Sequence, residues 1–219
     1  MRTKWAVMCA GLMLALAGRG EADEGRGFVI GGGLGPTRLN FGGSQGLVLL
    51  LGDSLGSIEF RGGDSLELRA GVIVPRTLLP SNVSDVVPVP AHQNGGVLSI
   101  QIGYSFSRRL ALLADFDLNG GWDNSFNQIM GAAAVRYSPA RRIWLEAGPA
   151  SGDLSYGFGS AVAQNVAGSG YGFLAAGGVV LMQKSKFQMD VQARSGTLWF
   201  DRFRITNVSV QIGVMRRRS

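Results

Sequence analysis

The sequence predicts an all-β protein, an up-and-down meander of antiparallel strands that closes into a barrel. Apolar runs of about ten residues recur from position 95 onward and are separated by links rich in turn-forming residues. Within the runs, apolar and polar residues alternate with a period of two, which indicates strands with one apolar and one polar face. No long pattern of period 3.6, as an amphipathic helix would give, follows the N-terminal segment.

The alternation is clearest near the C-terminus. In "FQMDVQAR" (187–194), Phe187, Met189 and Val191 point to one side, whereas Asp190 and Gln192 point to the other. The run "ITNVSVQIGVM" (205–215) repeats this pattern with valine and isoleucine. The expected strands, in chain order, cover 27–41, 97–106, 110–120, 128–137, 142–152, 172–182, 187–200 and 205–215.

The links between these runs alternate in length. Short links occupy 107–109, 138–141 and 183–186, and longer or glycine-rich links occupy 120–127, 153–170 and 198–204. Tight turns at one end and longer loops at the other are typical of an antiparallel up-and-down transmembrane β-barrel. Eight strands would form a closed sheet without free edges.

Residues 42–94 fit this scheme less simply. They contain the apolar runs "GLVLLL" and "LELRAGVIV" and a proline-rich stretch, "PSNVSDVVPVPAHQNGG". The segment is either a long first outer loop with its own hairpin or a source of two further strands, which would give ten. Both arrangements leave the direction of the other strands unchanged, and we favour eight.

The N-terminus predicts a cleaved signal peptide over residues 1–22, which leaves 23–219 as the barrel domain. The basic "MRTK" precedes an apolar stretch, and small residues near position 22 suit cleavage. Cleavage removes the single cysteine, Cys9, together with three of 21 basic and one of 15 acidic residues, which leaves a formal charge of +4. The basic residues lie in short turn-like clusters, so nucleic-acid binding is not indicated.

Several phrases resemble the small outer-membrane β-barrel proteins of Gram-negative bacteria, the OmpA/OmpX-like and porin-family barrels. They are "GFVIGGGLG" after the signal peptide, the turns "GYSFSRRLAL" and "RYSPARRIWL", and the terminal "NVSVQIGV". The resemblance implies a cell outer membrane location, contact with outer-membrane lipid and lipopolysaccharide, and insertion by the barrel assembly machinery. One departure is the C-terminus, which ends in Met215-Arg216-Arg217-Arg218-Ser219 where such barrels usually end in an aromatic residue.

In such a barrel the apolar faces contact lipid and the polar faces line the interior. Near the strand ends, Tyr104, Tyr137, Tyr156, Trp199 and Phe200 are candidates for the interfacial aromatic girdles, whereas the parity of Trp144 with Glu146 favours an inward position. Eight strands leave room inside only for side chains. We therefore expect a network of ion pairs and hydrogen bonds in the lumen, either a polar plug or a gated site, made by Asp115, Asp117, Arg136, Glu146, Asp190 and Arg194.

The sequence does not support an enzyme. Gly52-Asp53-Ser54-Leu55 looks like the nucleophile block of the GDSL esterases, but no histidine follows His92 to serve as the base, and a turn is the simpler interpretation. A barrel-type lipid hydrolase would need His92 to meet Ser81, Ser84 or Ser99. No cofactor is expected, and no metal-ligand cluster is present in the sequence.

The sequence thus favours a non-enzymatic, monomeric outer-membrane barrel with a structural, adhesive or small-permeation role. Its working surface would be the outer loops, above all 42–94 and 153–170. The alternatives are the barrel-type lipid hydrolase and a soluble periplasmic lipocalin-like barrel, in which the apolar faces would point inward.

Overall fold

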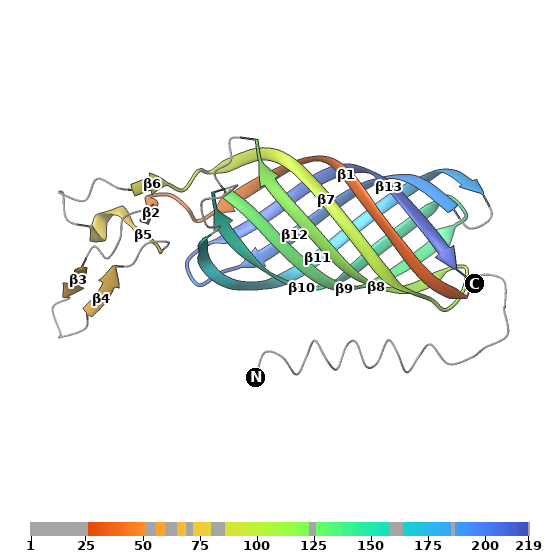
Figure 1. Ribbon diagram of the computed structural model, residues 1–219, viewed down its shortest axis with the longest axis horizontal. Coiled ribbons are helices and arrows are strands. Elements are labelled where there is room, and N and C mark those ends of the chain that lie inside the picture. The colour runs from red at the N-terminus through yellow and green to blue at the C-terminus, as the bar shows by residue number, and fades with distance from the viewer. Residues whose placement is uncertain are drawn as a thin grey trace.

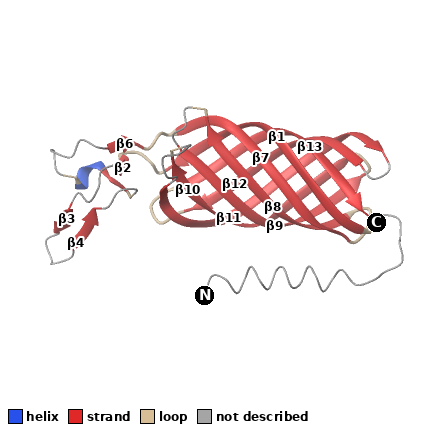
Figure 2. Cartoon of the chain, in the orientation of Figure 1, coloured by secondary structure: helices blue, strands red, loops and turns tan. Residues whose placement is uncertain are grey.

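The chain forms a closed antiparallel barrel of eight strands in the order β1-β13-β12-β11-β10-β9-β8-β7. The structure is a computed structural model that describes residues 26–50, 56–59, 65–68, 72–79, 86–122, 126–157, 164–184 and 187–218. Figures 1 and 2 show the barrel and its tilted strands. The barrel strands are β1 (Gly27–Gly42), β7 (His92–Ser105), β8 (Leu110–Gly121), β9 (Phe126–Ala140), β10 (Ile143–Tyr156), β11 (Gln164–Lys184), β12 (Phe187–Trp199) and β13 (Arg204–Arg218).

The first strand closes the barrel and decides the strand number. One edge of β1 pairs with β13 and the other pairs with β7, so that Leu34 lies opposite both Ile212 and Leu98. Both edges of β1 are therefore used, and no edge remains for additional strands. The prediction of eight strands is confirmed, and the alternative of ten is wrong.

The strands between β1 and β7 form two small sheets of their own. β2 (Leu47–Leu50) lies between β5 (Ile73–Pro75) and β6 (Val86–Pro88), and β3 (Gly56–Glu59) pairs with β4 (Ser65–Leu68). A short 3-10 helix, η1 (Arg76–Leu78), follows β5. We call the described residues between β1 and β7 the outer segment, and Figure 1 shows it beyond one end of the barrel.

The three-stranded sheet of the outer segment is packed onto the end of the barrel from which the segment leaves. Gly43 and Gly46, with φ of 84° and 73°, turn the chain from β1 into β2 in a left-handed conformation that favours glycine. Two backbone hydrogen bonds, from Phe41 N to the Ala91 carbonyl at 2.9 Å and from Arg76 N to the Gly46 carbonyl at 2.7 Å, fix the connection. We call the end of the barrel from which the outer segment leaves the outer end. The opposite end, where β1 begins, β13 ends and the short links lie, is the turn end.

The predicted loop over 153–170 is shorter than its composition suggests. β10 continues to Tyr156 and β11 begins at Gln164, with Asp153 paired to Ser169 and Ser155 paired to Asn165. This stretch is rich in glycine, serine and asparagine, so its residues do not alternate in polarity, although β10 and β11 still pair on both sides of a register shift between Asp153 and Ser155. The prediction of a loop at 153–156 and 164–170 is therefore wrong.

Some predictions fall outside the described residues. They concern the signal peptide over 1–22, the Gly52-Asp53-Ser54-Leu55 stretch, and Ser81 and Ser84. Among the described residues, no helix is long and apolar enough to cross a membrane.

Candidate functional site

Every second residue of the barrel strands points outward, and these residues form a continuous apolar belt. Ile212 is 60% exposed, Val210 is 54% exposed and Leu34 is 66% exposed. Of the large apolar side chains that are exposed in the described part of the chain, all but Trp122 belong to the eight barrel strands. A soluble monomer rarely leaves so large an apolar surface uncovered.

Charged side chains bound this belt. On β13, Arg204 and Arg216 are exposed and twelve residues apart, and the outward side chains between them are Thr206, Val208, Val210, Ile212 and Val214. A rise of about 3.3 Å per residue and a strand tilt of about 40° place the two arginines about 30 Å apart along the barrel axis. This spacing matches the thickness of a bilayer core.

Aromatic side chains lie at both ends of the belt. Tyr137 at the turn end and Trp199 at the outer end are each 47% exposed. Tyr171 and Trp122, 65% and 72% exposed, join Trp199 at the outer end. Sequence reasoning missed Tyr171 because it placed the strand start one residue later.

Two other predicted girdle residues take different places. Tyr156 and Phe200 pack against the apolar cluster at the outer end and so point away from the belt, which corrects their assignment. Trp144 is 1% exposed and points into the barrel, as its parity predicts.

The structure places all six candidate lumen residues inside the barrel. The alternating pleat brings them inward from four strands, β8, β9, β10 and β12. Each side chain is therefore shielded from the belt and from solvent. The exposed fractions are 1% for Asp115, 2% for Asp117, 4% for Arg136, 3% for Glu146, 3% for Asp190 and 2% for Arg194.

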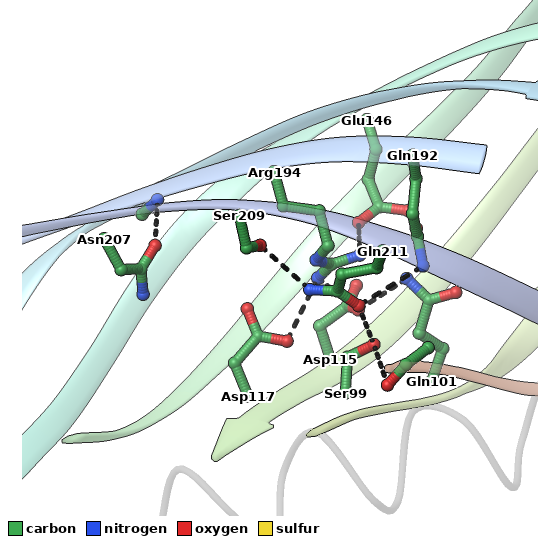
Figure 3. A network of polar contacts seen from close by, with 12 residues as sticks. Ser99, Gln101, Asp115, Asp117, Glu146, Gln192, Arg194, Asn207, Ser209 and Gln211 are labelled. Atoms are coloured by element: carbon green, nitrogen blue, oxygen red, sulfur yellow. Dashed lines mark hydrogen bonds and ion pairs between the residues drawn. The ribbon is translucent and has the colours of Figure 1, made fainter. Parts of the chain in front are cut away.

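Arg194 is the centre of this network (Figure 3). Its Nη2 lies 2.8 Å from Asp115 Oδ1 and 3.5 Å from Asp117 Oδ1, and its Nη1 lies 3.4 Å from Glu146 Oε1. One guanidinium thus faces three carboxylates from two other strands, which is the geometry that a planar fork of donors favours. The arginine ties β12 to β8 and β10 across the interior.

Arg136 forms the second half of the network. Its Nη2 lies 2.7 Å from Glu146 Oε2 and donates to Gln101 Oε1 at 2.8 Å. Its guanidinium stacks on the Trp144 ring, 3.9 Å from the centroid, which adds a cation–π contact. Glu146 therefore bridges both arginines.

Asp190 is held differently from the other carboxylates. Its Oδ2 accepts hydrogen bonds from Trp144 Nε1 and Gln188 Nε2, each at 3.1 Å. Its Oδ1 has no hydrogen-bond partner among the described residues. The sequence predicted Asp190 as a member of the network of ion pairs and hydrogen bonds, and among the described residues it takes part by hydrogen bonds, with the Trp144 indole as its connection to Arg136.

Uncharged polar side chains extend the network toward the outer end. Ser99 Oγ donates to Gln211 Oε1 at 2.7 Å, and Asn207 Nδ2 donates to Gln128 Oε1 at 2.9 Å. Gln101 links the two halves, because it donates to Asp115 at 2.7 Å and accepts from Arg136. The inward parity of these residues is the signal that could have added them to the predicted site.

Apolar clusters lie at both ends of the polar interior. Toward the turn end, Val29, Leu113 and Met215 are buried together. At the outer end a larger cluster joins barrel residues to the outer segment, and its members are Leu39, Phe41, Leu47, Leu49, Ile73, Val89, Phe126, Leu154, Phe203 and Ile205. The lumen is thus filled along its length, as expected for an eight-stranded barrel.

The proposed His92–Ser99 pair is not assembled. His92 begins β7 and is exposed at the outer end, whereas Ser99 points inward and is 1% exposed. An odd separation along a strand places two side chains on opposite faces of the sheet. The described residues also contain no group of three or more His, Cys, Asp or Glu residues that could hold a metal ion.

Gly178 makes room for the stacked indole. A Cβ at this position would lie 2.5 Å from Trp144 ring atoms. We expect Gly178→Ala to displace the ring from Arg136 and Asp190 and to lower the free energy of unfolding by about 1–3 kcal/mol. Urea titration would measure the loss, and the near-UV circular dichroism of Trp144 should change with it. Gly131→Ala, whose Cβ would meet no atom closer than 3.6 Å, is the control. Equal effects of the two substitutions would contradict the role given to Gly178.

The fold is that of a small, closed, eight-stranded antiparallel barrel with an apolar exterior and a polar, filled interior. No protein-family model matches the sequence, and no curated protein sequence matches it. Among solved structures, the chain is similar to Neisserial surface protein A (NspA), with 12% identity, a TM-score of 0.55, and coverage of 90% of this chain and 100% of that one. This similarity is one of fold.

Two further solved structures are more distant. Ail, the attachment invasion locus protein of Yersinia pestis, in complex with the heparin analogue sucrose octasulfate, has 11% identity and a TM-score of 0.43, with coverage of 87% of this chain and 99% of Ail. OprG, an outer membrane protein from Pseudomonas aeruginosa, has 10% identity and a TM-score of 0.37, with coverage of 89% and 98%.

Proposed function

We propose that this protein is a non-enzymatic β-barrel of the bacterial outer membrane that anchors and displays its outer segment. The observation that carries the proposal is the belt of outward apolar side chains, which is bounded by aromatic and charged residues and surrounds a buried polar interior. A soluble lipocalin-like barrel would need the opposite arrangement, with apolar residues inside and charges outside. The fold shared with NspA is compatible with this location.

The interior favours a structural or adhesive role over permeation. The charged network spans the lumen, and apolar clusters close it toward both ends. An ion would have to displace buried side chains at each of these layers, which costs their packing and hydrogen bonds. The protein acts by what it presents outside.

The outer segment is the surface that this barrel presents. Leu47 and Leu49 of β2 belong to the cluster on the barrel, while Val48 and Leu50 pack with Val74 in a second cluster of the outer segment. Both faces of β2 are therefore buried, and the three-stranded sheet of the outer segment is a folded structure fixed on the barrel. Lipopolysaccharide is the partner that we propose for this end, and the barrel assembly machinery is the proposed route of insertion.

Fractionation with gel mobility tests the membrane assignment. The full chain, expressed in a Gram-negative host, should sediment with outer membranes and migrate faster before boiling than after it, because a folded barrel resists the detergent. Recovery in the soluble periplasmic fraction, with the same mobility before and after boiling, would overturn the proposal and favour the lipocalin-like alternative.

Planar bilayer recording tests the filled lumen. We expect the purified full chain, once inserted, to give no stepwise ion conductance, because the two arginines and the apolar clusters close the path. Mobility before and after boiling would establish that the recorded protein is folded. Stable single-channel steps from folded wild-type protein would contradict the structural role and support permeation.

A further inference from the structure

The turn end of the barrel carries a ring of exposed basic side chains. They come from the links that follow β7 and β9, from the end of β11 and from β13. We call them the basic ring, and its described members are Arg109, Arg141, Arg142, Lys184 and Arg216. The ring surrounds the barrel on all the described links at this end.

The basic ring has no exposed acidic neighbour among the described side chains. Asp115, Asp117, Glu146 and Asp190 lie in the lumen, and Asp153 and Asp201 lie at the outer end. In the sequence, Asp23 and Glu24 precede the ring and lie outside the described residues. Five described cations at one end therefore give this end a positive potential, which attracts polyanionic surfaces.

The ring is continuous with the apolar belt. Arg109 adjoins Leu110, and Arg142 adjoins Ile143, which are 43% and 46% exposed on the outside of the barrel. The long arginine side chain can lie along apolar surface and present its guanidinium at the level of lipid headgroups. A guanidinium also binds the oxygens of a phosphate with two parallel hydrogen bonds. The ring thus has both the positive charge and the position at the edge of the apolar belt that suit the binding of a phosphate at a membrane surface.

We propose that the basic ring binds the phosphate headgroups of anionic phospholipids in the leaflet that the turn end faces. The inference rests on the proposed membrane-spanning function, because only a barrel that crosses the bilayer places the ring at headgroup level. Anionic lipid would then hold the turn end in its leaflet, at the opposite side of the membrane from the outer segment. Basic residues close to a lipid surface act additively, so removal of two should have a measurable effect.

Lipid titration of the detergent-folded full chain tests the ring. Native mass spectrometry would compare phosphatidylglycerol with phosphatidylcholine of the same acyl chains, for the wild type, R141Q/R142Q and R38Q/R204Q. The second double variant removes two exposed arginines at the outer end and is the matched control. We expect the wild type to prefer phosphatidylglycerol about tenfold or more, R141Q/R142Q to lose at least about fivefold of that preference, and the control to retain it.

The possible outcomes separate this inference from the proposed function. Insertion of the wild type into neutral phosphatidylcholine vesicles, followed by mobility before and after boiling, tests the membrane assignment without the ring. Failure to insert there would overturn the proposed function. Insertion without any preference for phosphatidylglycerol, or an equal loss in both double variants, would overturn only the ring. Inorganic phosphate gives a further outcome. If phosphate abolished the preference for phosphatidylglycerol while chloride at the same ionic strength left that preference intact, the result would also count against a lipid site.

Discussion

Replacing Arg194 with methionine should lower the free energy of unfolding by about 3–5 kcal/mol, because it leaves charged carboxylates in the barrel without their partner. Arg194 lies within 3.5 Å of Asp115, Asp117 and Glu146 and is 2% exposed. Urea-induced unfolding in lipid vesicles, followed by tryptophan fluorescence, would measure the change. Arg38→Met, at an exposed position near the outer end, should change stability by less than about 0.5 kcal/mol.

A combined variant separates charge pairing from packing. Arg194→Met together with Asp115→Asn and Asp117→Asn removes the arginine and two of the carboxylates that face it. This variant should recover part of the stability that Arg194→Met loses, since fewer buried charges remain without a partner. If R194M were as stable as the wild type, or if the added substitutions lowered stability further by a similar amount, the interior would not depend on charge pairing.

Ile212→Arg should lower the free energy of unfolding in vesicles by about 2–4 kcal/mol, the cost of a cation on the lipid face near the middle of the bilayer. Ile212 is 60% exposed on β13, and its neighbours Val191 and Leu34 are also exposed. Phe187→Arg, near the turn end, is the matched control and should cost about 1 kcal/mol or less, because the headgroups are within its reach. A soluble barrel would tolerate both substitutions equally, so similar effects would contradict the membrane assignment.

The sequence allowed the strands to be predicted because lipid and lumen impose opposite demands on neighbouring residues. The runs at 110–120 and 187–200 match β8 and β12 to within one residue at each end. At both, most outward positions carry an apolar side chain, with Ser195 and Thr197 of β12 as polar exceptions, so the period of two remains visible. The same parity placed Asp115, Asp117 and Arg194 inside the barrel.

Other features could not be predicted because their signal is not periodic. The contacts of Trp144 with Asp190 and of Arg194 with Asp115 cross the lumen between strands that are not adjacent. Such contacts depend on the stagger between the strands of the closed sheet, and this stagger cannot be deduced from the residue pattern of any single strand. The packing of the outer segment on Phe41 and Phe126 was likewise hidden, because its strands are only three or four residues long and show no regular alternation.

The most direct test of a membrane-spanning barrel is to measure which side of the barrel wall each of two adjacent residues of β13 faces. Cys9 is the only cysteine of the chain, so Cys9→Ser followed by Ile212→Cys or Gln211→Cys gives a single labelling site. With an environment-sensitive fluorophore on each variant in vesicles, a quencher dissolved in the lipid chains should strongly quench the label at 212 and leave the label at 211 nearly unchanged. Strong quenching at 211 with little at 212 would reverse inside and outside, and the membrane-spanning barrel would have to be abandoned.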